Sequence, residues 1–189
     1  KLFLQEALKE ADFYIKGDKV QTSVKDFKMR VNDALERVVN MVFHKLNYIT
    51  APKDDIDIRN LLKKDHDNII SLDVDVIENE FAIKEVTDFI RLKTQGHSRI
   101  SMKVIKDRFN GAPYGYTDTD IEWIVTKAFR NDRISLFVNG EAVSLLTETT
   151  DKLFDYLTKK AYTEKLMLEE KENISDRLKK ALKDVSLEL

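Results

Sequence analysis

The sequence predicts a mainly helical α+β fold that contains a winged-helix module at residues 75–145. Between Thr117 and Asn131, apolar residues follow the 3.6-residue period of an amphipathic helix. Further on, Asn139-Gly140 separates two runs of alternating apolar residues. An Asn-Gly pair in that position favours a type I′ hairpin, because both turn residues need positive φ. A short helix, a turn, a second helix and a hairpin follow one another in the order of a winged helix.

The ends of the helices in the predicted helix-turn-helix are marked by particular residues. Ser101 to Phe109 has the spacing of a short helix, and residues 110–116 (NGAPYGY) contain the Gly and Pro that interrupt regular structure. Thr117 stands where an N-cap belongs, with Asp120 three residues later as a variant of the capping box. A helix over residues 75–94 is expected to be the first helix of the module.

Before the module, residues 1–49 are predicted to form a hairpin and a long helix. Residues 2–11 have a helical pattern, and the hairpin is expected to turn at Gly17-Asp18. Asp26 to Leu46 carries the most regular apolar stripe of the chain, so we expect a core helix. The hairpin segment FYIKGDKV is similar to the wing segment LFVNGEAV. Residues 1–24 could therefore be the last helix and wing of a second, truncated winged helix, or the two hairpins could be unrelated.

The segments on either side of the module are predicted to be a connector and a tail. Residues 50–74 are acidic and irregular, apart from one short helix around Ile58, and are expected to link two halves. Residues 146–189 are expected to form a C-terminal helical tail that packs back, with helices over 152–162 and from Ser175. Residues 165–170 have the alternation of a strand, but Glu169 to Asn173 suits a helix surface equally well, so both remain open.

Composition excludes several classes of protein. The 189 residues include no Cys, which rules out disulfides, thiolate zinc sites and a Cys nucleophile and is consistent with a cytoplasmic protein. Charged residues make up 35% of the chain but nearly cancel to −2, so a globally basic nucleic-acid binder is not expected. No apolar run approaches a membrane span of roughly 18 residues, so no membrane partner is expected. The chain begins with Lys1 rather than Met, which predicts a piece of a longer protein.

Motifs for catalysis and metal binding are poorly represented, so we expect that this chain is not an enzyme. It contains no Gly-x-Ser-x-Gly elbow, and His44, His66 and His97 are far apart in the sequence. Asp65-His66-Asp67 offers residue types that bind metals, but a solvated polar turn is the favoured interpretation. No catalytic residue, metal or cofactor is therefore assigned within the chain.

The sequence is more informative about DNA contact than about catalysis. In a helix-turn-helix, the second helix offers its N-terminal part to the major groove. Here that part carries Asp118, Asp120 and Glu122, which would repel phosphate, and the wing tip ends in Glu141. Basic side chains nearby could still make nonspecific phosphate contacts. The candidates are Arg99, Lys103, Lys106, Lys127 and Arg133.

Residues of the helix-turn-helix are also candidates for protein contact. By helical phase, the Trp123 ring lies opposite the apolar stripe of its helix, and Trp and Arg are enriched at binding hot spots. We expect Trp123 to be at least half covered by residues outside 99–145, either from the 26–46 helix or from the tail that starts at Leu153. The tyrosines of the turn could stack on bases, but such residues more often pack at the turn. The interaction candidates are Trp123, Thr119, Arg130, Tyr114 and Tyr116.

Three segments together resemble one family. They are RVNDALERVVNMVFHKLNYI, RFNGAPYGYTDTDIEWIVTKAF and RISLFVNGE. These segments are similar to the region downstream of the ATPase core in the large P-loop proteins of bacterial BREX phage-defence systems (BrxC/PglY type), and the resemblance spans about residues 10–185. It implies a bacterial or archaeal cytoplasmic protein that binds ATP elsewhere in its full chain and works on phage or self DNA with BREX partners. The chain contains no Gly-x-x-x-x-Gly-Lys-Ser/Thr loop, so no nucleotide-site residue is carried over.

Two functions remain open from this resemblance, and an independent enzyme is poorly supported. The first is a non-catalytic scaffold of a P-loop ATPase, which passes ATP-driven motion to the rest of the parent protein and to other phage-defence proteins. The second is a winged-helix module that makes weak, nonspecific DNA contacts for that ATPase. Salt dependence separates the two, because phosphate contacts weaken steeply as salt rises.

Overall fold

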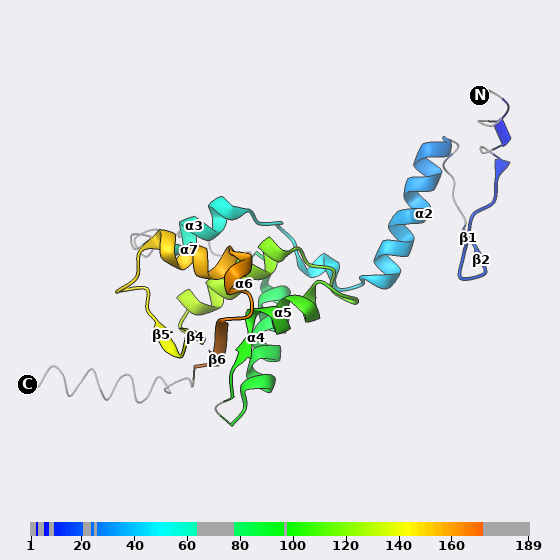
Figure 1. Cartoon of the computed structure of the whole chain (residues 1–189). Coiled ribbons are helices and arrows are strands. Elements are labelled where there is room, and N and C mark those ends of the chain that lie inside the picture. Colours follow the sequence, from blue (N-terminus) through cyan, green and yellow to red (C-terminus); the bar gives the residue numbers. More distant parts are fainter. Residues whose placement is uncertain are drawn as a thin grey trace, which may run out of the picture. The chain divides into compact units, whose positions relative to one another are not determined.

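The computed structural model describes residues 3, 6–7, 10–20, 24, 26–63, 78–96 and 98–171. The chain divides into two compact units (Figure 1). The small unit comprises residues 1–47 and 111–115, and the large unit comprises residues 48–110 and 116–189. Three predicted features lie outside the described residues: most of the helix over 2–11, the Asp65-His66-Asp67 turn, and the helix from Ser175.

The small unit begins with the predicted hairpin. Its strands β1 (Tyr14–Ile15) and β2 (Asp18–Lys19) pair in antiparallel register. The turn residues are Lys16 and Gly17, one position earlier than expected, with φ angles of 51° and 93°. Positive φ at both turn residues is the signature of a type I′ turn. That this hairpin ends a second winged helix stays a prediction.

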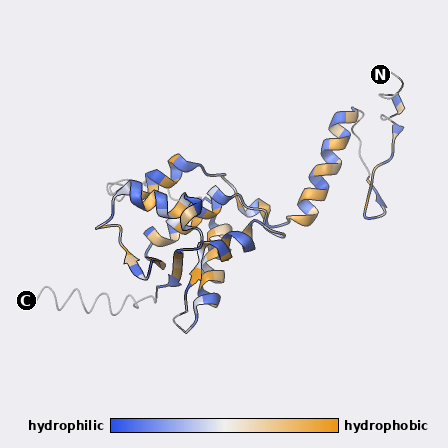
Figure 2. Cartoon of the chain, viewed as in Figure 1, coloured by the Kyte–Doolittle hydropathy of each residue, from blue (hydrophilic) through white to orange (hydrophobic). Residues whose placement is uncertain are grey.

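Helix α2 (Phe27–Val42) follows the hairpin. The Asp26 carboxylate caps it by accepting a hydrogen bond from the Met29 N–H at 3.0 Å, and the Phe13 ring stacks near Phe27 with centroids 6.4 Å apart. The expectation of a core helix was wrong for most of α2. Ala34 is its one buried residue within the described part of the chain, although apolar residues run along the helix (Figure 2). The substantially exposed apolar side chains are Met29, Leu35, Val38, Val39, Met41 and Val42.

Residues 111–115 pack within the small unit against the end of α2. The Lys45 N–H donates to the Pro113 carbonyl at 3.0 Å, and the Lys45 ammonium lies 5.1 Å from the centroid of the Tyr114 ring. Gly115 has a φ of 69°, and a Cβ at this position would lie 2.7 Å from the Phe43 ring. Both the backbone conformation and the close approach therefore require glycine.

The large unit has the element order of a winged helix, with further elements before and after it (Figure 1). The helices of the winged helix are α4 (Glu80–Thr94), α5 (Met102–Phe109) and α6 (Asp118–Arg130). Its strands are β3 (Ile100–Ser101), β4 (Ile134–Val138) and β5 (Glu141–Val143). The earlier elements are η1 (Leu46–Tyr48), which begins in the small unit, and α3 (Asp55–Leu62). The later elements are α7 (Thr150–Thr158), η3 (Lys160–Tyr162) and β6 (Leu166–Glu170).

The sheet of the large unit is antiparallel and has the strand order β3-β6-β4-β5. Asn139 and Gly140 join β4 to β5 with φ angles of 53° and 88°, so the predicted type I′ wing is confirmed. Residues 165–170, for which strand and helix both remained open, form β6, with Leu166 and Leu168 fully buried. Because β6 lies between β3 and β4, the wing strand β5 is left at the edge of the sheet.

Helix α6 is the centre of the large unit. The elements α3, α4, α5, α7 and β4 all pack against it. Its buried residues lie all round the helix and not on one stripe, from Asp120 through Thr126 and then at Ala128 and Phe129. The helices α3 and α7 cover the face of α6 that lies outside the predicted apolar stripe. Helix α3 contributes the buried side chains Ile58, Leu61 and Leu62, and α7 contributes Leu153, Phe154 and Leu157.

This packing corrects the predicted limits of the module. Residues 55–62, expected to belong to a connector over 50–74, form a core helix of the large unit. Residues 150–158, expected to belong to a tail over 146–189, pack back as predicted but onto α3 and α6. The compact winged-helix unit therefore extends on both sides of residues 75–145. The local pattern missed this because α3 and α7 lie far from α6 in the sequence.

Candidate interaction surface

Hydrogen bonds from side chains cap the N-terminus of α6. The Thr117 hydroxyl accepts from the Asp120 N–H at 3.1 Å, which completes the predicted cap. The Asp120 carboxylate also accepts from the Lys53 N–H at 2.9 Å, and only 4% of the residue is exposed. Asp120 therefore ties the loop before α3 to α6, and the prediction that it repels DNA phosphate was wrong.

A buried ion pair joins α5 to α6. The Lys106 Nζ lies 2.5 Å from a Glu122 carboxylate oxygen and 3.2 Å from Asp118, which also accepts from the Asn110 amide at 2.7 Å. Burial raises the pKa of Glu122 to about 7, while the Lys106 ammonium opposes this shift. The hydrogen bond from Asn110 lowers the pKa of Asp118. Glu122, like Asp120, is thus a buried structural group, and of the three carboxylates only Asp118 is exposed. That Asp118 repels phosphate stays a prediction.

The basic residues predicted to contact phosphate are largely neutralised by neighbouring acids. Arg99 lies 3.1 Å from the Glu169 carboxylate and 3.4 Å from the centroid of the Phe137 ring. Lys103 lies 3.6 Å from the Glu164 carboxylate, and Lys106 belongs to the buried pair with Glu122. Lys127 and Arg133 form no ion pair with an acid in the described part of the chain. Two of the five candidates thus keep an uncompensated positive charge.

The aromatic candidates are buried side chains of the fold. Trp123 is 7% exposed, with the Lys53 ammonium 5.0 Å from its ring centroid. The expected cover from outside residues 99–145 is confirmed, but this contact comes from the loop before α3, which was not among the predicted sources. Tyr116 is 2% exposed and stacks on Phe109 with centroids 5.9 Å apart, and Tyr114 is 4% exposed. None of these three rings is therefore presented to a partner or to nucleic acid bases.

Thr119 and Arg130 share the face of Trp123 but have different environments. Thr119 is partly exposed near the start of α6. Arg130, at the end of α6, donates a hydrogen bond to the Lys63 carbonyl at 2.9 Å. Arg130 also lines a surface pocket.

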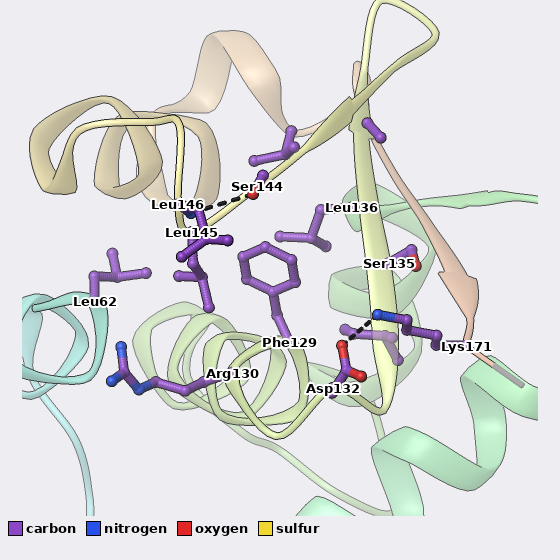
Figure 3. Close-up of a pocket in the computed structure, with 13 residues that line it drawn as sticks. Leu62, Phe129, Arg130, Asp132, Ser135, Leu136, Ser144, Leu145, Leu146 and Lys171 are labelled. Atoms are coloured by element: carbon purple, nitrogen blue, oxygen red, sulfur yellow. Dashed lines mark hydrogen bonds and ion pairs between the residues drawn. The ribbon is translucent and has the colours of Figure 1, made fainter. Parts of the chain in front are cut away.

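This pocket lies between the wing and the ends of α3 and α6 (Figure 3). It has a volume of about 540 Å³. Apolar side chains from four segments line it: Leu62, Phe129, Leu136, Val143, Leu145 and Leu146. Arg130, Asp132 and Lys171 add charge to the lining, and an ion pair joins Lys171 to Asp132. We call this site the wing pocket.

Sequence reasoning missed the wing pocket because its residues are brought together by the tertiary fold. Leu62 belongs to the segment expected to be a connector, and Lys171 follows residues for which strand and helix both remained open. One local signal was present, namely the apolar pair Leu145-Leu146 directly after the wing. Two adjacent leucines at the start of a turn indicate either a buried turn or an exposed apolar site. Leu146 is 83% exposed, which favours the second case.

Metal sites and membrane spans are two further possibilities for the described part of the chain. No three potential ligands among His, Cys, Asp and Glu gather there in a way that could hold a metal ion. The helices described here are all too short or too polar to cross a lipid bilayer.

The chain matches the family model described as the winged helix-turn-helix domain of the BREX ATP-binding protein BrxC, over residues 45–172. No solved structure matches the chain. The matched residues include α3, α7 and β6, so the family's domain contains the elements that surround α6 as well as the central helix-turn-helix. The P-loop core of such a protein lies outside this chain. The chain therefore belongs to the BrxC family of BREX ATP-binding proteins, and it carries the winged helix-turn-helix domain of that family.

Proposed function

We propose that this winged-helix domain is a non-catalytic scaffold, which connects a BREX ATP-binding protein of phage defence to protein partners. The observation that carries the proposal is the burial of α6 on all sides. A helix-turn-helix that reads DNA lays its second helix in the major groove, and this requires a free helix face. In the large unit, α3 and α7 occupy the face that the groove would need.

The charges around α6 support the same proposal. Tight binding to DNA requires several cations that can each neutralise a phosphate. Lys106 is buried against Glu122, and Arg99 and Lys103 face Glu169 and Glu164. The wing ends in an exposed Glu141. A surface with this charge pattern is better suited to a protein partner than to a nucleic acid.

Under this proposal, the parent protein binds ATP through a segment outside this chain, and the domain itself needs no cofactor. Its partners are the rest of the parent protein and other phage-defence proteins, all in the cytoplasm. ATP-driven movement would reach these partners through the large unit. The buried core around α6 and the Lys106–Glu122 pair support a rigid body that can transmit such movement.

Nonspecific DNA contact is the second candidate, and one feature favours it. A polar pocket of about 510 Å³ lies beside α5 and the turn after α7. Its lining includes the exposed lysines Lys103, Lys160 and Lys165. Asp107 and Glu164 lie in the same lining and oppose the attraction of phosphate. Any DNA binding at this pocket would therefore be weak and unselective.

The two candidates are separated by duplex binding measured at salt concentrations from about 50 to 200 mM. A labelled DNA duplex is titrated with the chain and followed by fluorescence anisotropy. If the domain is a scaffold alone, little binding is detected at any of these salt concentrations. If it also contacts DNA at the polar pocket, binding is independent of the duplex sequence and falls steeply as salt rises, and the double variant Lys160→Ala/Lys165→Ala removes most of it. Lys84→Ala, on the outer face of α4, is the matched control. Tight binding to one duplex at physiological salt would exclude the scaffold proposal.

A further inference from the structure

Residues 111–115, the turn of the helix-turn-helix, belong to the small unit and not to the large one. We call them the turn segment. Its Pro113 carbonyl accepts a hydrogen bond from the Lys45 N–H at 3.0 Å. Gly115 lets the Phe43 ring approach so closely that a Cβ at this position would lie 2.7 Å from it. The residues directly after α2 therefore hold the turn segment by both backbone and packing contacts.

These contacts begin at the last turn of α2. The Phe43 N–H donates to the Val39 carbonyl at 2.7 Å, so Phe43 continues the hydrogen bonding of the helix. The Leu46 N–H donates to the Phe43 carbonyl at 2.9 Å and encloses Lys45 in a tight turn. Hydrogen bonds thus run from α2 to the turn segment without a gap, and a movement of α2 would also move the turn segment.

The residues on either side of the turn segment belong to the large unit and are joined to each other. The Tyr116 N–H donates to the Phe109 carbonyl at 3.0 Å, and the two rings stack with centroids 5.9 Å apart. The Asn110 amide donates to the Asp118 carboxylate at 2.7 Å, and Asp118 also lies 3.2 Å from the Lys106 Nζ. Because peptide bonds link the turn segment to Asn110 and Tyr116, its displacement would act on these bonds at the start of α6.

We propose that the turn segment is a joint, through which the small unit controls how well the first turn of α6 is ordered. Both ends of the segment are covalently linked to the large unit, and its middle is held by the residues that follow α2. The matched family domain begins at residue 45, so α2 lies before it and the joint lies within it. This inference rests on the proposed scaffold function, because it names the route by which movement enters the domain.

The test disrupts α2 and follows hydrogen exchange in the large unit of the complete chain. Ala34→Asp places a carboxylate at a buried position of α2 and should unfold the helix. Exchange at the amides of Tyr116 and Asp120 should then become about tenfold faster, while the amides that pair β4 with β6 keep their rates. Asn32→Asp, which adds the same carboxylate at an exposed position of α2, should leave all these rates unchanged.

A double-mutant cycle tests whether the effect passes through the turn segment. Phe43→Ala removes the ring that contacts Gly115. In this background Ala34→Asp should change the two exchange rates less than about twofold, because both substitutions act on the same connection. If circular dichroism shows that Ala34→Asp leaves α2 folded, Val38→Pro takes its place in both measurements, since proline breaks a helix interior even at an exposed position.

Three outcomes would overturn the joint. Loss of α2 without faster exchange at Tyr116 and Asp120 would show that the two units are independent. Exchange that rises equally between β4 and β6, or an undiminished effect in Phe43→Ala, would show that the effect does not pass through the turn segment. The scaffold function fails separately, through tight and sequence-specific DNA binding in the duplex titration. Independent units together with weak DNA binding would reject the joint and leave the scaffold function intact.

Discussion

Helices α2 and α6 have similar sequence patterns and opposite environments. Each carries a regular apolar stripe, and each is capped by a side chain, Asp26 in one and Thr117 in the other. In the small unit, α2 buries only Ala34 among its described residues. In the large unit, α6 buries residues on every side, including two carboxylates. The pattern was stronger along α2, yet α6 is the core helix.

The comparison shows that an amphipathic pattern predicts an apolar face but does not tell whether the chain covers it. A stripe at 3.6-residue spacing arises from the helix itself. Whether that stripe is buried depends on other elements of the fold. The helices that bury α6, α3 and α7, lie up to about 60 residues before it and 30 residues after it in the chain. The next three pairs of substitutions are ordered from the largest expected effect on stability to the smallest, and each pair compares the two helices.

Lys106→Met should reduce the free energy of unfolding by the largest amount. It leaves the buried Glu122 carboxyl without its cation, and breaking a buried pair in this way costs about 3–5 kcal/mol. The matched change in α2 is Arg37→Ala, which removes a partly exposed pair with Asp33 that is worth about 0.3–0.5 kcal/mol. Urea unfolding at pH 8 measures both, with Trp123, the single Trp, reporting on the large unit and circular dichroism on α2. Equal losses would show that α6 is no better covered than α2.

Ile124→Ala tests whether apolar side chains stabilise α6 more than they stabilise α2. Ile124 is fully buried in α6, so the substitution should cost about 2–5 kcal/mol through lost burial and an unfilled cavity. Leu35→Ala in α2 should cost about 0.5 kcal/mol, because Leu35 is 57% exposed and little burial is lost. Thermal unfolding of the two variants measures the difference between these two losses of stability. A loss of several kcal/mol at Leu35 would mean that the apolar face of α2 is covered in solution.

The two helix caps should show a smaller difference. Thr117→Ala removes one half of the reciprocal cap of α6 and should cost about 1–2 kcal/mol. Asp26→Ala removes a single exposed hydrogen bond to Met29 and should cost about 0.5–1 kcal/mol. Hydrogen exchange at the first amides of each helix measures the two losses separately. The comparison fails if the first turn of α2 loses more protection than that of α6.

The pH dependence of stability is a separate test of the burial of α6. Burial raises the pKa of Glu122 to about 7, so the folded chain holds a proton that the unfolded chain has already released. Stability of the large unit should therefore fall as pH rises from about 4.5 to 7 and then level off. Glu122→Gln should remove this slope, and Asp107→Asn, an exposed acid on α5, serves as the control. A slope of the opposite sign would show that the pairing with Lys106 outweighs burial.

The helix-turn-helix and the wing could be predicted from the sequence because their signals are local. Asn139-Gly140 adopts the type I′ turn, since few other residue pairs accept positive φ at both positions. Thr117 caps α6 as expected, because its hydroxyl needs to reach only the backbone three residues away. The same holds for the hairpin at Lys16 and Gly17.

The tertiary structure alone decided what surrounds these elements. β6 inserts between β3 and β4, and α3 and α7 close over α6, which buries Trp123, Asp120 and Glu122. The sequence presented Asp120 and Glu122 as surface acids because their partners, the Lys53 N–H and the Lys106 ammonium, lie 67 and 16 residues away. The wing pocket has the same origin, since residues from Leu62 to Lys171 line it. Local spacing fixes turns and caps, whereas burial and charge pairing depend on which distant segments meet.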